Sequence, residues 1–309
     1  MLKTRRLNKY AKTFNRSLED KYLSTYENGD VRELLDYSLS GGKRMRPAII
    51  YDIFYSLGKG GNVIDGSYIA FTTELIHSSS LIIDDLPCMD NDDVRRGRET
   101  VHKRYGILAA KMVSTLLISD AHSMLFKMYD TLRGRIPDLD ERMLIVLENI
   151  TTNIGIEGAA YGQYLDMIPK YSNEFRETME SELENYSTDS VLQQIIEKKT
   201  GVIFEIAFIS AYVFGGGDLQ YLEDVIQASH DFGRIFQIYD DLKDESEDRE
   251  RMVNGLTPNY VIRFGRKHSL QVISQSIYNF RNTMIKVGLY SKFFNDMMLH
   301  IYRGMKSQV

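Results

Sequence analysis

The 309-residue chain has little of what marks secreted, membrane-spanning or nucleic-acid-binding proteins. Its single cysteine, Cys88, cannot form an internal disulfide, so nothing indicates an oxidising compartment. Its longest strongly apolar stretch, residues 202–214, contains Glu205 and is shorter than the about 20 residues that cross a bilayer. The 38 Lys and Arg are outnumbered by 43 Asp and Glu, which argues against a broad nucleic-acid-binding face. We therefore expect a cytoplasmic protein with no membrane span and no nucleic-acid partner.

The first twenty residues are basic and contain no acid before Glu19, a pattern that faintly resembles a transit peptide. Leu7, Ala11, Phe14 and Leu18, however, recur at helical spacing. We favour an ordinary first helix.

Proline is scarce, with five residues, and tryptophan is absent, while Leu, Ile, Met, Tyr and Phe recur at three- and four-residue spacing. This composition predicts a nearly all-α protein of about a dozen helices without a convincing strand. Breaks rich in Gly, Pro, Asn or Asp fall at 27–30, 58–62, 87–97, 133–138, 168–173, 215–218 and 255–259. Residues 170–190 are predicted to be a polar excursion between two core helices. Nothing else resembles a linker, so we predict one domain over residues 1–309.

Aspartates crowd at the end of an apolar run in LIIDDLPCMDNDDVRRGR, residues 81–98. Pro87 should end the helix there and let Asp90 fold back toward Asp84. A second acidic cluster, FQIYDDLKDESED at residues 236–248, places Asp240 and Asp244 on one helix face. Like charges at this spacing destabilise a helix by a few tenths of a kcal/mol, so proximity alone does not explain them.

Divalent metal offers an explanation for both acidic clusters. Magnesium prefers oxygen ligands and binds through one or two carboxylates together with substrate phosphate. Two carboxylate helix ends facing each other would hold a diphosphate through bridging ions. Either cluster alone could be a solvated acidic loop, but the same D-D-(x)n-D form after two apolar helices favours the metal interpretation.

Basic residues accompany the acidic clusters. The segment GGKRMRP, residues 41–47, joins two glycines and a helix amino end to Lys43, Arg44 and Arg46, which suits an anion, although a basic surface is the alternative. Arg95 and Arg96 follow the first cluster, where they could simply neutralise it. The triplet 199–201, Lys-Thr-Gly, precedes the apolar run, and its glycine could be only a helix break.

His77 lies two helical turns before Asp84 and within about 20° of the same face. A lone histidine is more often structural than a ligand. Thr73 and Ser80 share its stripe, and this line of small polar groups indicates a channel.

Gln163 and Asp166 are three residues apart on another helix. They are candidates for a functional site, and a buried hydrogen-bonded pair with only a structural role is an equal alternative. We interpret Cys88 as a packing residue.

Together these residues resemble the trans-isoprenyl diphosphate synthases, the farnesyl and geranylgeranyl diphosphate synthase family. GGKRMRP, ELIHSSSLIIDDLPCMDNDDVRRG, GQYLDM, KTG and FQIYDDLKD occur in the family's order over nearly the whole chain. The resemblance implies a single-domain all-α bundle of the isoprenoid synthase type, with a central active-site cavity, that is usually a homodimer. It implies condensation of isopentenyl diphosphate with a dimethylallyl, geranyl or farnesyl diphosphate.

The resemblance also implies residue roles. About three Mg²⁺ ions would be held on the allylic diphosphate by Asp84, Asp85, Asp90, Asp240, Asp241 and Asp244. That diphosphate would contact Arg95, Lys199, Thr200 and Gln237. Isopentenyl diphosphate would contact Lys43, Arg46, His77 and Arg96. Product length in the family depends largely on the positions of Ser79 and Ser80, where two serines instead of an aromatic imply a chain of twenty carbons or more, with geranylgeranyl diphosphate first.

The sequence departs from the family after the second acidic cluster. A lysine that contacts the allylic diphosphate is expected near residues 255–257, which are Gly, Leu and Thr here. Lys243, Arg249, Arg251 or Lys267 are possible substitutes. Ile83 replaces a common histidine. A non-catalytic regulatory subunit and a class I terpene cyclase are the alternatives, but the chain keeps both acidic clusters and GGKRMRP.

Overall fold

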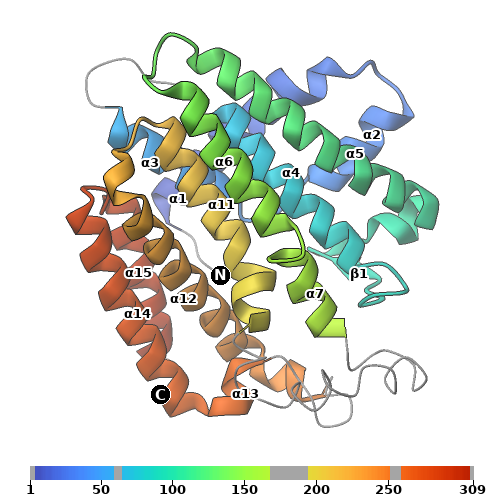
Figure 1. Ribbon diagram of the computed structural model, residues 1–309. Coiled ribbons are helices and arrows are strands. Elements are labelled where there is room, and N and C mark those ends of the chain that lie inside the picture. Colours follow the sequence, from blue (N-terminus) through green and yellow to red (C-terminus); the bar gives the residue numbers. More distant parts are fainter. Residues whose placement is uncertain (1–3, 59–64, 168–193, 251–258, 307–309) are drawn as a thin grey trace. The chain divides into compact units, whose positions relative to one another are not determined.

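The computed structural model describes residues 4–58, 65–167, 194–250 and 259–306 (Figure 1). Apart from one short hairpin, their regular structure is helical, as the sequence predicts. The predicted excursion at 170–190 and the expected lysine position at 255–257 lie outside the described residues. The described part divides into two compact units, residues 3–143 with 210–216 and residues 144–209 with 217–309. The single domain expected over residues 1–309 stays a prediction.

The first unit begins with α1 (Arg5–Ser17), the short π-helix η1 (Leu18–Tyr22) and the 3₁₀ turn η2 (Leu23–Thr25). The helices α2 (Asp30–Leu39), α3 (Met45–Leu57), α4 (Ser67–Asp84) and α5 (Val101–Leu132) follow. Helix α4 is buried along most of its length and packs along α5 (Figure 1). The buried side chains of α1, Leu7, Tyr10 and Phe14, confirm the predicted first helix.

A hairpin that the sequence interpretation missed joins α4 to α5. Its strands β1 (Val94–Arg95) and β2 (Arg98–Glu99) pair antiparallel, with Arg95 opposite Arg98. The two turn residues, Arg96 and Gly97, both have positive φ angles, 55° and 76°. Such two-residue turns favour glycine, so the Arg-Gly pair is the signal that identifies the hairpin.

The second unit contains most of α6 (Leu139–Ile154) and α11 (Val202–Phe214), the helix α7 (Ala159–Met167) and the π-helix η4 (Ile196–Gly201). The 3₁₀ turn η5 (Leu219–Tyr221) leads into α12 (Leu222–Glu250), which is followed by α13 (Tyr260–Phe264), α14 (Arg266–Lys286) and α15 (Lys292–Lys306). Helix α12 packs along α14. The core of this unit is aromatic and contains Phe204, Phe208, Phe232, Phe280 and Phe294, whose neighbouring ring centroids lie 5.1 to 6.1 Å apart.

None of the helices within the described ranges is long and apolar enough to cross a bilayer.

Candidate functional site

The first acidic cluster forms a tight turn at the end of α4. The helix ends at Asp84, three residues before Pro87, and the Asp90 backbone N–H donates to the Asp84 carbonyl oxygen at 2.8 Å. This confirms that the chain folds back as predicted. Both side chains are half-buried. The turn therefore brings two aspartates together that a straight helix would separate.

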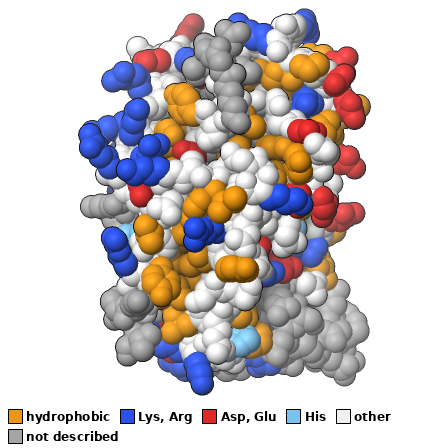
Figure 2. Space-filling model, turned by 90° about the vertical axis from the view of Figure 1, so that its left-hand side faces the viewer, with side chains coloured by type: hydrophobic (Ala, Val, Ile, Leu, Met, Phe, Trp, Pro, Cys, Tyr) orange, Lys and Arg blue, Asp and Glu red, His pale blue; other side chains and the backbone are white. Residues whose placement is uncertain are grey.

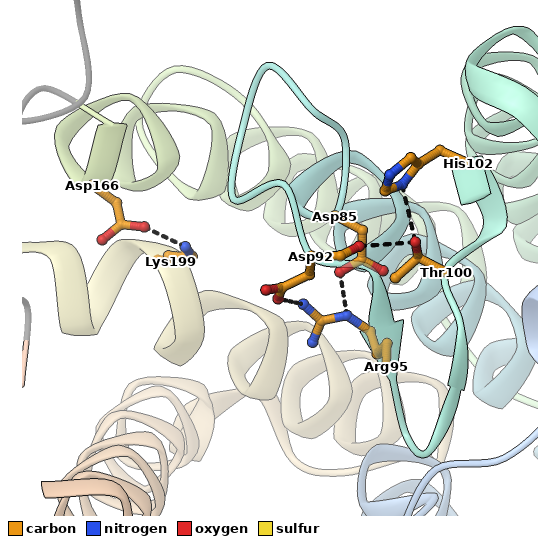
Figure 3. Close-up of polar contacts among 7 residues, drawn as sticks. All are labelled: Asp85, Asp92, Arg95, Thr100, His102, Asp166 and Lys199. Atoms are coloured by element: carbon orange, nitrogen blue, oxygen red, sulfur yellow. Dashed lines mark hydrogen bonds and ion pairs between the residues drawn. The ribbon is translucent and has the colours of Figure 1, made fainter. Parts of the chain in front are cut away.

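Asp85 differs from its neighbours because it is 4% exposed. Arg95 Nε donates to its Oδ1, and Arg95 Nη2 donates to Asp92 Oδ2 at 3.2 Å (Figure 3). Burial raises the pKa of Asp85 to about 6, against the opposing effect of Arg95. Thr100 braces the same loop, since its hydroxyl donates to the Asp92 carbonyl oxygen at 2.9 Å. The hairpin arginine thus pairs with two aspartates of the cluster, and its predicted contact with the allylic diphosphate stays a prediction.

The basic residues predicted to hold isopentenyl diphosphate lie around His77. Burial lowers the pKa of His77 well below its usual value, and Arg46 and Arg96 lower it further. Its Nδ1 is buried and has no hydrogen-bond partner among the described residues. The Arg96 guanidinium lies against the backbone of Gly42, where an added Cβ would come within 2.7 Å of it. Arg46 and Arg96 are thus near enough to His77 to lower its pKa, Arg96 also lies against Gly42, and Lys43 is exposed and next to Gly42 in sequence.

Arg44, which the sequence suggested as part of the anion site, has a structural role instead. It is 3% exposed and donates through Nη1 to Glu74 Oε1 at 2.7 Å and through Nε to Asn15 Oδ1 at 2.9 Å. Its guanidinium also lies 5.1 Å from the centre of the Phe14 ring. A buried pair of this kind fixes the GGKRMRP segment on α4 and α1.

Tyr37 of α2 is a residue that sequence reasoning missed. Its hydroxyl donates to the Glu99 carbonyl oxygen at 2.8 Å, and its own carbonyl oxygen accepts from Arg98 Nη2 at 2.9 Å. The Arg98 and Arg104 guanidinium groups lie 4.3 and 4.7 Å from its ring centre. Tyr37 therefore holds strand β2, and with it the hairpin that carries Arg95 and Arg96. No sequence pattern points to it, because its partners lie more than sixty residues away.

The two predicted chain-length serines make different contacts. Ser79 is 1% exposed, and its Oγ lies 2.8 Å from Ser114 Oγ and donates to the Ser114 carbonyl oxygen on α5. Ser80 Oγ donates to the carbonyl oxygen of His77 at 3.0 Å. Thr73 Oγ1 likewise donates to a carbonyl oxygen of its own helix, that of Ile69. The hydroxyls of this stripe are thus satisfied by backbone or by α5, and the channel stays a prediction.

In the second unit the GQYLDM and KTG motifs meet. Lys199 Nζ lies 2.5 Å from Asp166 Oδ2 (Figure 3). A Cβ on Gly162 would lie 2.5 Å from the Lys199 backbone nitrogen, and one on Gly233 would lie 3.0 Å from the Gly201 Cα. Gly162 of GQYLDM and Gly233 of α12 therefore permit close packing around the π-helix η4, a helix type that is frequent at functional sites. The side chain of Thr200 lies outside the described residues.

The second acidic cluster separates into two kinds of carboxylate. Asp241 is 7% exposed and accepts from the Tyr260 backbone N–H and from Gln237 Nε2, both at 2.8 Å. Burial raises its pKa to about 7 despite these bonds. Asp240 and Asp244 are more accessible, and burial together with Asp240 raises the pKa of Asp244. Asp240 accepts from Lys243 Nζ at 2.7 Å, which places one of the possible replacement lysines inside this cluster.

Asn259, also missed from the sequence, ties this cluster to α13. Asn259 is 2% exposed, and its side-chain oxygen caps α13 by accepting from the Val261 and Ile262 N–H groups. Its side-chain amide donates to the Asp241 carbonyl oxygen and to the Asp248 carboxylate. Its side chain thereby orients the acidic end of α12.

The donor set suits magnesium in kind, since it consists of carboxylate oxygens. Among the described residues, no three His, Cys, Asp or Glu side chains form a group that could hold a metal ion. Magnesium sites in proteins use one or two carboxylates and complete their shell with phosphate and water. The carboxylate oxygens of the two clusters fit such an ion in kind, and its binding stays a prediction.

Comparison with known proteins gives a consistent result. Residues 29–256 match the polyprenyl synthetase family model. The chain is 31% identical to farnesyl diphosphate synthase of Micrococcus luteus over 272 residues, covering 85% of this chain and 84% of that protein. It is 33% identical to the heterodimeric geranylgeranyl pyrophosphate synthase large subunit 2 of Arabidopsis thaliana, covering 78% of this chain and 59% of that protein. The crystal structure of a geranyltransferase from Legionella pneumophila superposes with a TM-score of 0.75 at 25% identity, over 97% of this chain and 96% of that one.

Proposed function

The chain belongs to the polyprenyl synthetase family and has its all-α fold, and we propose that it is a trans-prenyltransferase condensing isopentenyl diphosphate with an allylic diphosphate. The observation that carries this proposal is the acidic turn in which Asp90 N–H binds the Asp84 carbonyl, directly followed by the arginine hairpin. Carboxylates for metal and guanidinium groups for phosphate are thereby held on one short segment.

About three Mg²⁺ ions would neutralise charge developing on the departing diphosphate. We assign their binding to Asp84 and Asp90 in the first cluster and to Asp240 and Asp244 in the second. Asp85 and Asp241 have positioning roles as well, because their oxygens accept from Arg95, Gln237 and the Tyr260 backbone N–H; their predicted metal contacts stay predictions.

The chain's own residues bind and orient the second substrate. Arg46, Arg96 and Lys43 supply positive charge for the diphosphate of isopentenyl diphosphate, and neutral His77 supplies a hydrogen-bond donor. The allylic C–O bond breaks to release diphosphate, the isopentenyl double bond attacks the allylic cation, and the resulting cation loses a proton to the departing diphosphate. Arg95, Lys199, Thr200 and Gln237 are assigned to the allylic diphosphate. Exclusion of water from the growing apolar chain protects the carbocation.

The product is proposed to have twenty carbons or more, with geranylgeranyl diphosphate first. Two small side chains, Ser79 and Ser80, support this length. Relatives named for farnesyl and for geranylgeranyl products have similar sequence identity to this chain, so sequence identity alone does not indicate the product length.

We assign homodimer formation to α5. Its exposed side chains Leu108, Met112, Thr115, Ser119 and Phe126 follow a three-and-four spacing, and Leu108, Met112 and Phe126 are 73%, 64% and 57% exposed. A stripe with three large exposed apolar side chains is typical of a helix that packs on another helix. Met112→Glu should convert the protein to a monomer in sedimentation velocity; an unchanged mass would contradict this assignment.

The function is tested with purified protein, labelled isopentenyl diphosphate and each allylic primer, with Mg²⁺ or with chelator, and the product lengths are resolved. Metal-dependent elongation supports the proposal. Asp84→Asn should lower kcat at least a hundredfold, whereas Asp93→Asn, which removes only a surface ion pair with Lys103, should stay within roughly threefold. A folded protein that elongates no primer would contradict the proposal.

A further inference from the structure

Helix α1 carries a one-sided basic face that the proposed reaction does not use. Arg5, Lys9, Lys12 and Arg16 are all exposed and fall within an arc of about 60° at 100° per residue. The buried side chains of the same helix lie roughly opposite. From the first to the last of these cations the helix rises about 16 Å. We call these four residues the α1 basic face.

Within the residues that the structure describes, the charge of the α1 basic face has no acidic partner. None of its four cations forms an ion pair with another residue in the described part of the chain, and α1 has no acidic residue. The nearest acid in sequence, Glu19, pairs with Arg32. This local excess contrasts with the net charge of −5 of the whole chain. Figure 2 shows that Lys and Arg side chains are likewise gathered in groups on the face of the molecule drawn there.

The arrangement is unfavourable for an isolated helix. Arg5 and Lys9, and again Lys12 and Arg16, are like charges at i and i+4, which destabilise a helix. Arg5 also lies in the first turn, next to the positive end of the helix dipole, and no acid stands there to offset it. A bound polyanion would remove both penalties.

An aromatic side chain flanks this helix. Tyr55 of α3 is 52% exposed and stacks on Tyr10 with ring centroids 6.1 Å apart. Tyr10 belongs to the buried face of α1, so this aromatic pair lies away from the α1 basic face and does not contribute to it. The apolar face of α1 is buried, so contact would be electrostatic and peripheral.

We propose that the α1 basic face docks on an anionic phospholipid bilayer. The choice of a bilayer over another polyanion rests on the proposed function, because a prenyl diphosphate of twenty carbons is an amphiphile that partitions into lipid. Docking would place its release beside the membrane.

The test is co-sedimentation with vesicles of phosphatidylcholine, with and without phosphatidylserine, at low and high salt. We expect binding only to the anionic vesicles, weakened by salt because the contact is screened. Lys9→Gln/Lys12→Gln should lower the partition coefficient about thirtyfold, from ~1 kcal/mol per cation. The matched double variant Lys127→Gln/Lys292→Gln removes two exposed cations elsewhere and should leave binding within about twofold.

Equal binding to neutral vesicles, an equal loss in both double variants, or binding of duplex DNA but not of anionic vesicles would overturn the proposal. Prenyl transfer is measured separately with all three proteins and should be the same. If vesicles are bound as expected but none of the three proteins transfers a prenyl group, the proposed function is refuted and the docking surface is not. Transfer without vesicle binding would refute the surface alone.

Discussion

Tyr37 offers the sharpest test of how Arg95 and Arg96, the hairpin arginines proposed to bind substrate, are held. Its hydroxyl bond to the Glu99 carbonyl contributes about 1 kcal/mol net. The two guanidinium groups over its ring contribute about 0.5 to 1 kcal/mol each, and its edge contact with Tyr105, at 5.2 Å, a similar amount. Arg104 and Tyr105 belong to α5, so the part that holds strand β2 to α2, from the Glu99 bond and the Arg98 contact, is about 1.5 to 2 kcal/mol.

Loosening this contact should act on substrate binding. If the hairpin is in its binding position in only a fraction of the molecules, the apparent affinity for substrate falls in proportion to that fraction. Tyr37→Phe should raise the KM for isopentenyl diphosphate by up to about fivefold, and Tyr37→Leu by up to about thirtyfold. The KM for the allylic substrate should rise as well, because Arg95 and Arg96 share the hairpin, whereas kcat at saturation should change less.

The assay is steady-state kinetics with each substrate varied in turn, together with the thermal midpoint of each variant. Tyr278→Leu is the matched control, since that tyrosine is 63% exposed on α14 and should change neither KM. Unchanged KM values in a folded Tyr37→Leu protein would refute the reasoning. A loss of activity that is fully explained by a smaller folded fraction of the variant would also refute the reasoning.

Three further predictions concern other contacts. Ser79→Tyr should shorten the product, because a ring replaces the small buried hydroxyl that bonds to α5, and an unchanged product ladder would defeat the chain-length assignment. Arg44→Met should destabilise the protein by about 3 to 5 kcal/mol, since it leaves Glu74 buried without its partner; denaturant unfolding measures this, and the Arg44→Met/Glu74→Leu double variant should recover most of it. The pair of His230 Nε2 and Glu205 Oε2, 2.6 Å apart, should stabilise the fold most between about pH 4.5 and 6.5. The hydrogen bond to Glu205 raises the pKa of His230, so its contribution is lost as pH rises through the raised value. Burial opposes ionisation of Glu205, but the bonds from His230 and two asparagines outweigh it and lower its pKa, so that contribution is lost as pH falls. His230→Gln should remove the alkaline part of this dependence in thermal melts, and an identical profile in both proteins would contradict it.

Local sequence determined the class of the fold and the first acidic turn. Few prolines and the helical spacing of apolar residues predict helices from within each segment, and Pro87 ends α4 near the residue where the structure ends it. The spacing of Asp84 and Asp90 across this helix end predicted that the two residues lie close together, as they do. Such features depend on residues only a few positions apart in the chain, so they can be predicted from the sequence alone.

Tertiary structure alone decided which members of each charged cluster are buried and paired. Arg44 and Arg46 are two residues apart, yet one is committed to Glu74 while the other lies by His77. Asp84 and Asp85 are adjacent, yet only the second pairs with Arg95. Tyr37 and Asn259 gain their roles from partners far along the chain or from a helix end. Burial and pairing depend on which distant segment packs nearby, and no periodicity within a segment encodes that choice.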